Sequence, residues 1–299
     1  MDLVVGATGV LGGEICHQLV AEGRSIRAVV RQTSDAGRVS SLKQMGAELV
    51  EADLKVHASL NGACEGIENV ITTATTTISR QPGDTIQSVD LEGQRNLVDA
   101  ARANGVRHFV YISYSADIDR DDPCPLTVAK STIERHLQES GMTYSILQPS
   151  ILMDIWLSPA LGFDYANARA QISGTGEARL SWIAVRDVAR FAVLALSHPS
   201  FVNATWELGG PDALSPLEVV RLFEGVGGRQ FELSHVPEEA LRAQRASATD
   251  PLEQSFAALM LANAAGYEVD LRPLLEACPV DLMSVREYAE AALAAQRVS

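Results

Sequence analysis

The stretch Gly6-Ala7-Thr8-Gly9-Val10-Leu11-Gly12 decides the fold of this chain. It follows the short apolar run at residues 3–5, which predicts a strand. After it, apolar side chains recur every four residues at Leu11, Ile15 and Leu19, which places them on one face of a helix. A glycine-rich turn between a strand and a helix is the context that a dinucleotide-binding fingerprint requires.

Each glycine of this turn has a separate physical task. Gly6 permits the tight turn, Gly9 lets the backbone approach a pyrophosphate, and Gly12 allows the helix to pack closely on the strand. The helix N-terminus presents free N–H groups and a partial positive charge to the phosphates. The alternative is a chance glycine cluster in a structural turn, which the flanking strand and helix disfavour. The predicted nucleotide contacts of the turn are Gly6, Thr8, Gly9, Val10, Leu11 and Gly12.

The first half of the chain repeats the strand–helix alternation. Further strands are predicted at residues 26–30, 48–51, 69–72, 108–112 and 143–147, and helices at residues 90–103 and 127–138. Such alternation implies a parallel sheet with crossover helices on both faces. We therefore predict an α/β fold whose residues 1–150 form a Rossmann-type, doubly wound parallel sheet.

The pattern changes after about residue 150, where Pro149, Pro159 and small residues interrupt it. Residues 151–299 predict a smaller, mixed C-terminal substrate lobe, interleaved with the sheet in a single compact unit. The polar, alanine-rich residues 240–250 predict a mobile surface segment, and two more helices are expected near the C-terminus. The shorter elements are strands at residues 180–183, 205–208 and 230–234 and helices at residues 185–196 and 216–225.

The composition excludes several classes of partner. Among 299 residues, 24 basic side chains face 38 acidic ones, for a net charge of -14, which repels nucleic acid and anionic membranes. Cys16, Cys64, Cys124 and Cys278 are scattered and form no CxxC pair, so no metal or redox motif is predicted. No apolar stretch reaches the ~18 residues of a membrane span. A cytoplasmic protein acting on a small molecule is expected, and self-association stays open.

The second predicted strand indicates which nucleotide is bound. NAD binders place Asp or Glu at the end of this strand to hold the ribose 2′-hydroxyl. Here the strand ends at Arg31, and no carboxylate follows before Asp35. Arg31 could bind a 2′-phosphate through a charge-assisted bidentate contact, or it could be a solvated arginine. We predict NADP(H) in preference to NAD(H).

Several later motifs, in this order and spacing, resemble the NmrA-like branch of the atypical short-chain dehydrogenase/reductase superfamily. The resemblance covers roughly residues 2 to 236, and the remaining residues match no motif that we recognise. The motifs are GATGVLGGEI, EADLKVHASL, VITTAT, YISYSA, AKSTIERHLQESGMTYSILQPSILMD, LSWIAVRDVARFAVLAL and WELGGPDALSPLEVV.

The resemblance implies roles for further residues. It places Asp53 and Leu54 beside the adenine, and it places Ser113 at the position of the family's active-site serine. It also implies that Lys130 binds the nicotinamide ribose. The segments expected along the cofactor are Thr73, Ala74 and Thr75 at the far ribose and Pro149, Ser150 and Ile151 in the covering loop.

One expected catalytic residue is missing. Many short-chain reductases carry Tyr-x-x-x-Lys on one helix, where the lysine lowers the tyrosine pKa and the tyrosine transfers a proton. Leu126 stands four residues before Lys130, which puts the usual carbonyl-reductase mechanism in doubt. Lys130, Ser113 and Tyr114 are the candidate catalytic residues. Their alternatives are a solvated lysine paired with Glu134, a hydroxyl that caps a turn, and a packed or surface tyrosine.

Three functions remain open from the sequence. The first is an NADP(H)-dependent oxidoreductase that transfers hydride to or from a small apolar or quinone-like substrate, which needs little proton help. The second is a non-catalytic dinucleotide-binding redox sensor that acts through a protein partner, which the missing tyrosine also fits. The third is a sugar-nucleotide epimerase or dehydratase, which Leu126 disfavours.

Overall fold

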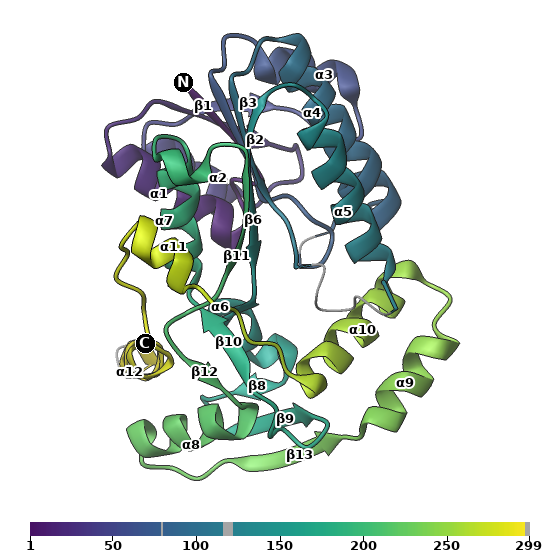
Figure 1. Cartoon of the computed structure of the whole chain (residues 1–299), viewed down its shortest axis with the longest axis vertical. Helices are drawn as coiled ribbons and strands as arrows, with labels where there is room; N and C mark the ends of the chain where they lie inside the picture. Colours follow the sequence, from purple (N-terminus) through teal and green to yellow (C-terminus); the bar gives the residue numbers. More distant parts are fainter. Residues whose placement is uncertain (79, 116–121, 297–299) are drawn as a thin grey trace. The chain divides into compact units, whose positions relative to one another are not determined.

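A computed structural model describes residues 1–78, 80–115 and 122–296 (Figure 1). The chain forms two compact units, and each of them is built from three separate stretches of the sequence. Unit 1 comprises Met1–Tyr114, Pro125–Gln148 and Val188–Trp206. Unit 2 comprises Ser115–Cys124, Pro149–Asp187 and Glu207–Ser299.

Unit 1 is organised around a seven-stranded sheet with the order β11-β6-β5-β4-β1-β2-β3. The pairings between neighbours from β6 to β3 are all parallel. The order reverses direction between β1 and β4, which is the switch point where open α/β sheets bind ligands. The strands are β1 (Asp2–Val5), β2 (Ile26–Val30), β3 (Glu48–Glu51), β4 (Asn69–Thr72), β5 (His108–Ile112), β6 (Thr143–Pro149) and β11 (Ala204–Leu208).

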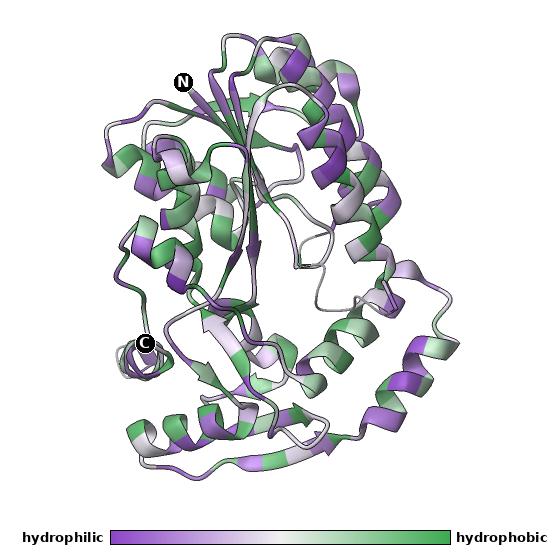
Figure 2. Cartoon of the chain, viewed as in Figure 1, coloured by the Kyte–Doolittle hydropathy of each residue, from purple (hydrophilic) through white to green (hydrophobic). Residues whose placement is uncertain are grey.

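Helices cover both faces of this sheet, as the alternation predicts (Figure 1). One face carries α1 (Val10–Ala21), α2 (Ala36–Gln44) and α7 (Val185–Ala195), and the other carries α3 (His57–Cys64), α4 (Glu92–Ala103) and α5 (Pro125–Gln138). β1, β4 and β5 are buried along their whole length, because helices shield them on both sides. In Figure 2 hydrophobic and hydrophilic residues alternate along these helices, as expected for amphipathic elements. The predicted α/β class and parallel sheet are confirmed.

Unit 2 contains two small sheets, with the orders β12-β10-β7 and β13-β9-β8. Phe163, Phe223 and Phe231 belong to its core, and the rings of Phe163 and Phe223 meet edge to face at 5.0 Å. The strands are β7 (Ile151–Leu152), β8 (Phe163–Asp164), β9 (Arg169–Ser173), β10 (Leu180–Ile183), β12 (Ala213–Leu214) and β13 (Glu232–Val236). The helices are α6 (Met153–Trp156), α8 (Pro216–Gly227), α9 (Glu238–Ser247), α10 (Pro251–Ala265), α11 (Arg272–Ala277) and α12 (Val285–Gln296).

The C-terminal third differs from the sequence-based expectation in two respects. Between β13 and residue 296 the structure has four helices instead of the two expected, and residues 240–250 are mostly helix α9 instead of an irregular segment. Alanine favours helix, the ion pair between Arg242 and Glu238 spans one turn, and Asp250 caps α10 through the N–H groups of Leu252 and Glu253. In addition, the strand at residues 204–208 joins the large sheet and not a sheet of unit 2.

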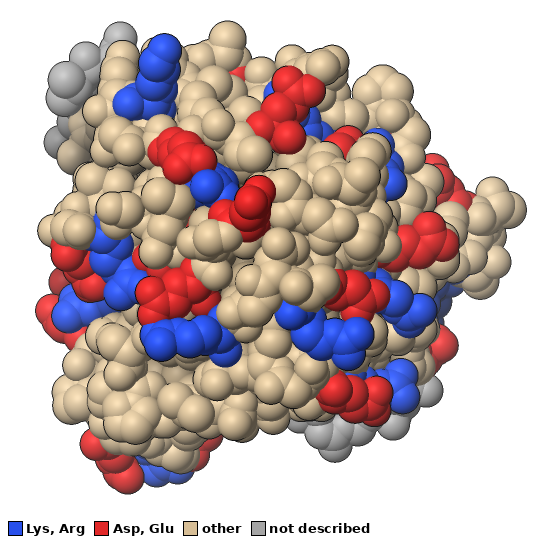
Figure 3. Space-filling view, turned by 90° about the horizontal axis from the view of Figure 1, so that it is seen from above, with Lys and Arg blue, Asp and Glu red and all other residues tan. Residues whose placement is uncertain are grey.

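Two further observations concern the length of the helices and the charge of the surface. Over residues 1–78, 80–115 and 122–296, no helix is long and apolar enough to cross a membrane. On the face shown in Figure 3, acidic and basic side chains are interspersed.

Candidate functional site

The glycine-rich turn connects β1 to α1, and two of its glycines leave no room for a side chain. Gly6 has φ +86°, and a Cβ there would lie 2.6 Å from Oγ1 of Thr73. A Cβ on Gly12 would lie 2.1 Å from the carbonyl oxygen of Gly6. The N–H of Gly9 donates to that same oxygen at 2.8 Å. The turn is therefore closed by tight internal contacts that only glycine permits at these two positions.

The N-terminus of α1 is suited to an anion. Gly9 is its N-cap residue, and no side chain of the described chain caps the helix. No acidic residue lies in the first turn. The first N–H groups of a helix have no partner within the helix, so here they can bind an added phosphate. Thr8, Val10 and Leu11, which the sequence also predicts at the site, belong to this turn and the first turn of α1.

An arginine that the sequence analysis did not select lies against this turn. Arg38, in the first turn of α2, donates from Nη1 to the carbonyl oxygen of Thr8 at 2.5 Å. Asp35 caps α2 by accepting the N–H of Arg38 at 2.9 Å, which fixes the start of the helix. A basic residue one turn into the helix after the second strand is the sequence signal that could have identified it.

Arg31 lies directly after β2 as predicted, but it faces a carboxylate from a distant part of the chain. Its Nη1 lies 2.8 Å from Oδ2 of Asp84, and Nζ of Lys55 lies 2.5 Å from Oδ1 of the same residue. Only 2% of the Asp84 side chain is exposed. Desolvation raises the Asp84 pKa, but the hydrogen bonds from Lys55, the Gln81 backbone and Arg31 outweigh it, so the pKa lies below its ordinary value. Arg31 and Lys55 thus form a small basic group held by Asp84.

The segment predicted along the far ribose lies next to this turn, and the residues predicted beside the adenine also belong to unit 1. The N–H of Thr73 donates to the carbonyl of Val5 at 2.9 Å, which brings the segment after β4 next to the segment after β1. The carbonyl of Ala74 accepts from Gln94 at 2.8 Å, and Oγ1 of Thr75 is buried without a hydrogen-bond partner among the described residues. Leu54 is buried in the core, and Oδ1 of Asp53 accepts the N–H of Lys55.

Lys130 is buried on α5 and does not behave as a solvated lysine. Its Nζ donates to the carbonyl of Ile112 at 3.3 Å and lies 5.2 Å from the centre of the Tyr111 ring. Burial lowers the Lys130 pKa below its ordinary value, and the negative charges of Asp90 and Glu134 oppose this shift. The proposed pairing of Lys130 with Glu134 is replaced by a bond from Gln148 to Glu134 at 2.8 Å.

The neighbours of Lys130 include further polar groups without partners. Oγ of Ser113 and the hydroxyl of Tyr111 are buried and have no hydrogen-bond partner in the described chain. Tyr114 follows Ser113 directly. Leu126 is 1% exposed and therefore belongs to the apolar core, so it supplies no proton-transfer group. An unpaired buried hydroxyl is costly, which makes Ser113 a candidate contact for a bound molecule.

Asp90 is a second residue that the sequence analysis did not select. It lies in a π-helix (η1, Ile86–Leu91) that leads into α4, and π-helical turns are frequent at functional sites. Its Oδ2 accepts from both the N–H and the hydroxyl of Thr76, at 3.1 and 2.5 Å. Its Oδ1 is buried without a partner among the described residues. Asp90 therefore contributes a negative charge to the surroundings of Lys130.

The buried state of Lys130 predicts a pH dependence of stability. Its pKa in the folded chain lies below the ordinary value of 10.5, so between these two values the folded state binds fewer protons than the unfolded state. The contribution of Lys130 to the free energy of unfolding therefore rises with pH in this window. Urea unfolding measures the free energy of unfolding of the wild type and of Lys130→Met. The value for the wild type minus the value for the variant should increase from neutral to alkaline pH. A difference that stays constant would contradict a depressed lysine pKa.

The predicted covering loop lies in unit 2. Pro149 ends β6, and Ile151 begins β7. Between them, the N–H of Ser150 donates to the carbonyl of Leu208 at 2.9 Å, and its hydroxyl donates to the carbonyl of Ser181 at 2.8 Å. The Ser150 side chain therefore anchors this segment to unit 2.

A third group missed from the sequence is a hydrogen-bonded cluster within unit 2. The hydroxyl of Tyr267 lies 2.7 Å from Oγ of Ser115, and both hydroxyls donate to the carboxylate of Glu207. Ser115 is fully buried. These residues are far apart in the sequence, so no local pattern could have brought them together.

Comparison with known proteins agrees with this geometry. The model of the NmrA-like family matches residues 3–289, which extends the likeness beyond residue 236. The Photosystem II assembly factor Ycf39 of Synechocystis sp. is 30% identical over 93% of this chain and 85% of its own length. An NAD(P)H azoreductase of Xenophilus azovorans is 30% identical over 77% of this chain and 74% of its own length.

Solved structures show the same fold. An NADPH-dependent quinone oxidoreductase of Escherichia coli, in complex with NADPH, superimposes with a TM-score of 0.75 at 19% identity. The match covers 98% of this chain and 99% of that protein. The glycine-rich turn, the strand order and the family match over residues 3–289 lead to one conclusion. The chain belongs to the NmrA-like family.

Proposed function

We propose that this protein is an NADP(H)-dependent oxidoreductase acting on a small apolar or quinone-like substrate. The observation that carries the proposal is the uncapped N-terminus of α1, which follows a turn so tight that Gly6 and Gly12 leave no room for a side chain. The names of two similar proteins support it, since one is an NAD(P)H azoreductase and another an NADPH-dependent quinone oxidoreductase.

Different residues of unit 1 would bind different parts of the cofactor. The N-terminus of α1 would bind the diphosphate, and Arg31 with Arg38 would bind the 2′-phosphate. Lys130 would hold the nicotinamide ribose, with the hydroxyl of Ser113 as a further contact. The remaining proposed contacts are Asp53, Leu54, Thr73, Ala74 and Thr75 in unit 1 and Pro149, Ser150 and Ile151 in unit 2.

The proposed substrate class follows from the lack of a tyrosine proton donor four residues before Lys130. The bound nicotinamide supplies or accepts hydride. Leu126 is apolar and buried, so the usual tyrosine proton donor has no counterpart at this position. A quinone or an activated double bond needs little proton help at the moment of hydride transfer, so binding and orientation are the main tasks left to the protein.

Arg31→Ala and Arg38→Ala test the proposed cofactor preference. Each should weaken NADPH binding by about 10-fold or more, because a charge-assisted hydrogen bond is lost, and should leave NADH binding nearly unchanged. Fluorescence titration of the reduced nicotinamide measures both affinities. Arg107→Ala, at a surface arginine paired with Glu68, is the control. An equal loss for NADPH and NADH would remove these arginines as the determinants of preference.

A second function is favoured by one specific observation. Leu126 at the usual tyrosine position suits a protein that binds NAD(P)H as a sensor and acts through a protein partner. The likeness to a photosystem II assembly factor is consistent with such a role.

Turnover separates the two functions. NADPH oxidation should be followed by absorbance with a panel of quinones, azo dyes and enones as acceptors. Acceptor-dependent oxidation that Lys130→Met suppresses supports the oxidoreductase. Tight NADPH binding without oxidation by any acceptor would favour the sensor instead.

A further inference from the structure

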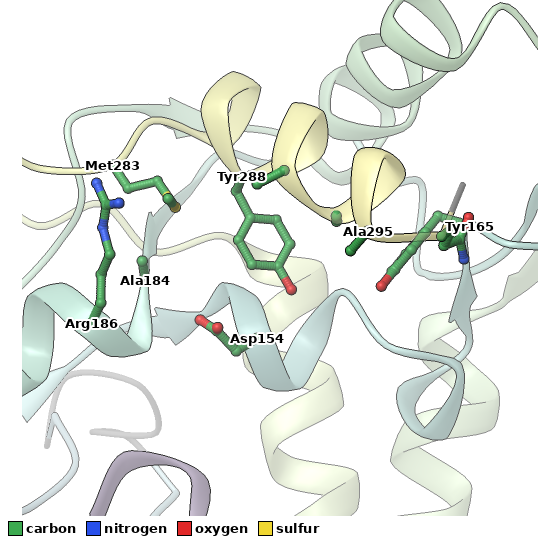
Figure 4. Close-up of a pocket in the computed structure, with 10 residues that line it drawn as sticks. Asp154, Tyr165, Ala184, Arg186, Met283, Tyr288 and Ala295 are labelled. Atoms are coloured by element: carbon green, nitrogen blue, oxygen red, sulfur yellow. The ribbon is translucent and has the colours of Figure 1, made fainter. Parts of the chain in front are cut away.

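Unit 2 contains a cavity of about 440 Å³, and none of the residues that line it is among the proposed cofactor contacts. This volume lies within the range of small-molecule sites, roughly 300–1,000 Å³. Its wall includes residues of helix α6, of the start of α7 and of the C-terminal helix α12, together with Tyr165, which follows β8, and with Ala184 and Met283, which precede α7 and α12 (Figure 4). They come from different parts of the sequence, but all of them belong to unit 2.

One part of the cavity wall is polar and carries a negative charge. Asp154 on α6 accepts the N–H of Val185 through Oδ2 at 2.8 Å, its only hydrogen bond in residues 1–78, 80–115 and 122–296. Tyr288 projects from α12 toward Asp154 in Figure 4, and Tyr165 lies at one end of the cavity. Neither tyrosine hydroxyl has a hydrogen-bond partner within the same described ranges. Burial, with Asp154 and Tyr165 nearby, raises the Tyr288 pKa, so its hydroxyl stays neutral.

Most of the other residues of the wall are apolar. Met283 and Ala184 line it, and besides Tyr288 and Gln296 the helix α12 contributes the small side chains of Ala291, Ala292 and Ala295. The basic residue on the wall is Arg186, at the end opposite Tyr165 in Figure 4. Its guanidinium lies 3.4 Å from the carboxylate of Asp187, which also accepts the N–H of Met283. The positive charge of Arg186 is therefore paired with the carboxylate of Asp187.

We propose that this cavity binds a small primary amine with an apolar or aromatic body. An ammonium group has three donors, which match the carboxylate of Asp154 and the two tyrosine hydroxyls, and the tyrosine rings favour a nearby cation. The apolar body would lie along the alanines of α12 and Met283. An anion would meet the charge of Asp154, and a purely apolar ligand would bury that carboxylate without a positively charged partner.

Isothermal titration calorimetry on the full-length protein tests this inference with 2-phenylethylamine and its neutral counterpart, 2-phenylethanol. The amine should bind saturably and at least about 10-fold more tightly than the alcohol, because only the amine forms charge-assisted bonds to Asp154. Asp154→Asn keeps an acceptor for the N–H of Val185 and should weaken amine binding by about 10-fold or more.

Tyr288→Phe keeps the ring, removes the hydroxyl and should weaken amine binding about 5-fold, which keeps the inference testable if Asp154→Asn does not fold. Tyr144→Phe, in β6 and outside the cavity wall, is the matched control. Equal affinity for amine and alcohol, no saturable amine binding, or wild-type affinity in the two cavity variants would overturn the inference. NADPH titrations of the same variants should match wild type, so this inference and the proposed function can fail separately.

Discussion

Replacing Gly12 by alanine is expected to abolish dinucleotide binding. The added Cβ would lie 2.1 Å from the carbonyl oxygen of Gly6 and 3.0 Å from Cα of Ala7, so the turn or α1 must move. Both contacts are with backbone, which cannot yield as the end of a flexible side chain can. The N–H groups of α1 would then leave the positions that the turn gives them. A fluorescence titration with NADPH should show at least about a 100-fold loss of affinity.

Gly13→Ala is the matched control for this prediction. A Cβ on Gly13 would lie 3.5 Å from the carbonyl of Ala7, an ordinary van der Waals contact. Since Gly13 lies inside α1, alanine should even stabilise the helix, by about 0.5–1 kcal/mol. Circular dichroism and thermal unfolding of both variants separate loss of binding from loss of fold. A folded Gly12→Ala variant that binds NADPH like wild type would contradict the role assigned to the turn.

Lys130→Met is expected to lower turnover by about 100-fold or more while the fold is retained. The methionine side chain has a similar length and is apolar, so it suits the buried position on α5. It removes the ammonium group that donates to Ile112 and that would hold the nicotinamide ribose. A misplaced reacting group costs about this factor even when binding persists. Steady-state NADPH oxidation with the best quinone acceptor measures the effect.

Lys43→Met is the control, because Lys43 is an exposed lysine in the last turn of α2. It should leave both turnover and NADPH affinity unchanged. Should Lys130→Met oxidise NADPH at the wild-type rate, Lys130 would have only a structural role.

Local patterns predicted the parts of the site that depend on local geometry. The glycine-rich turn and the six parallel strands follow from residue types at short spacing, and the structure confirms the strands to within two residues. The position of Lys130 on a helix was also predicted. Its burial was not, because this depends on Tyr111 and Asp90, which belong to other elements.

The parts that could not be predicted are contacts between distant segments. Asp84 reaches Arg31 across 53 residues, so a search for an acidic residue near the second strand could not find it. The same holds for the cluster of Ser115, Glu207 and Tyr267, whose members meet only through the tertiary fold. Helix α9 was not predicted because its alanine-rich, polar sequence lacks the apolar periodicity that marks a helix.

The central claim is that unit 1 binds a dinucleotide at the glycine-rich turn and prefers the one that carries a 2′-phosphate. Paired titrations of the wild-type protein with NADPH and NADH, followed by fluorescence of the bound nicotinamide, test this most directly. The account predicts saturable binding of both and an NADPH affinity at least about 10-fold higher, because Arg31 and Arg38 would contact only the phosphorylated ribose. Equal affinities would contradict the preference, and binding of neither would contradict the assignment of the turn itself.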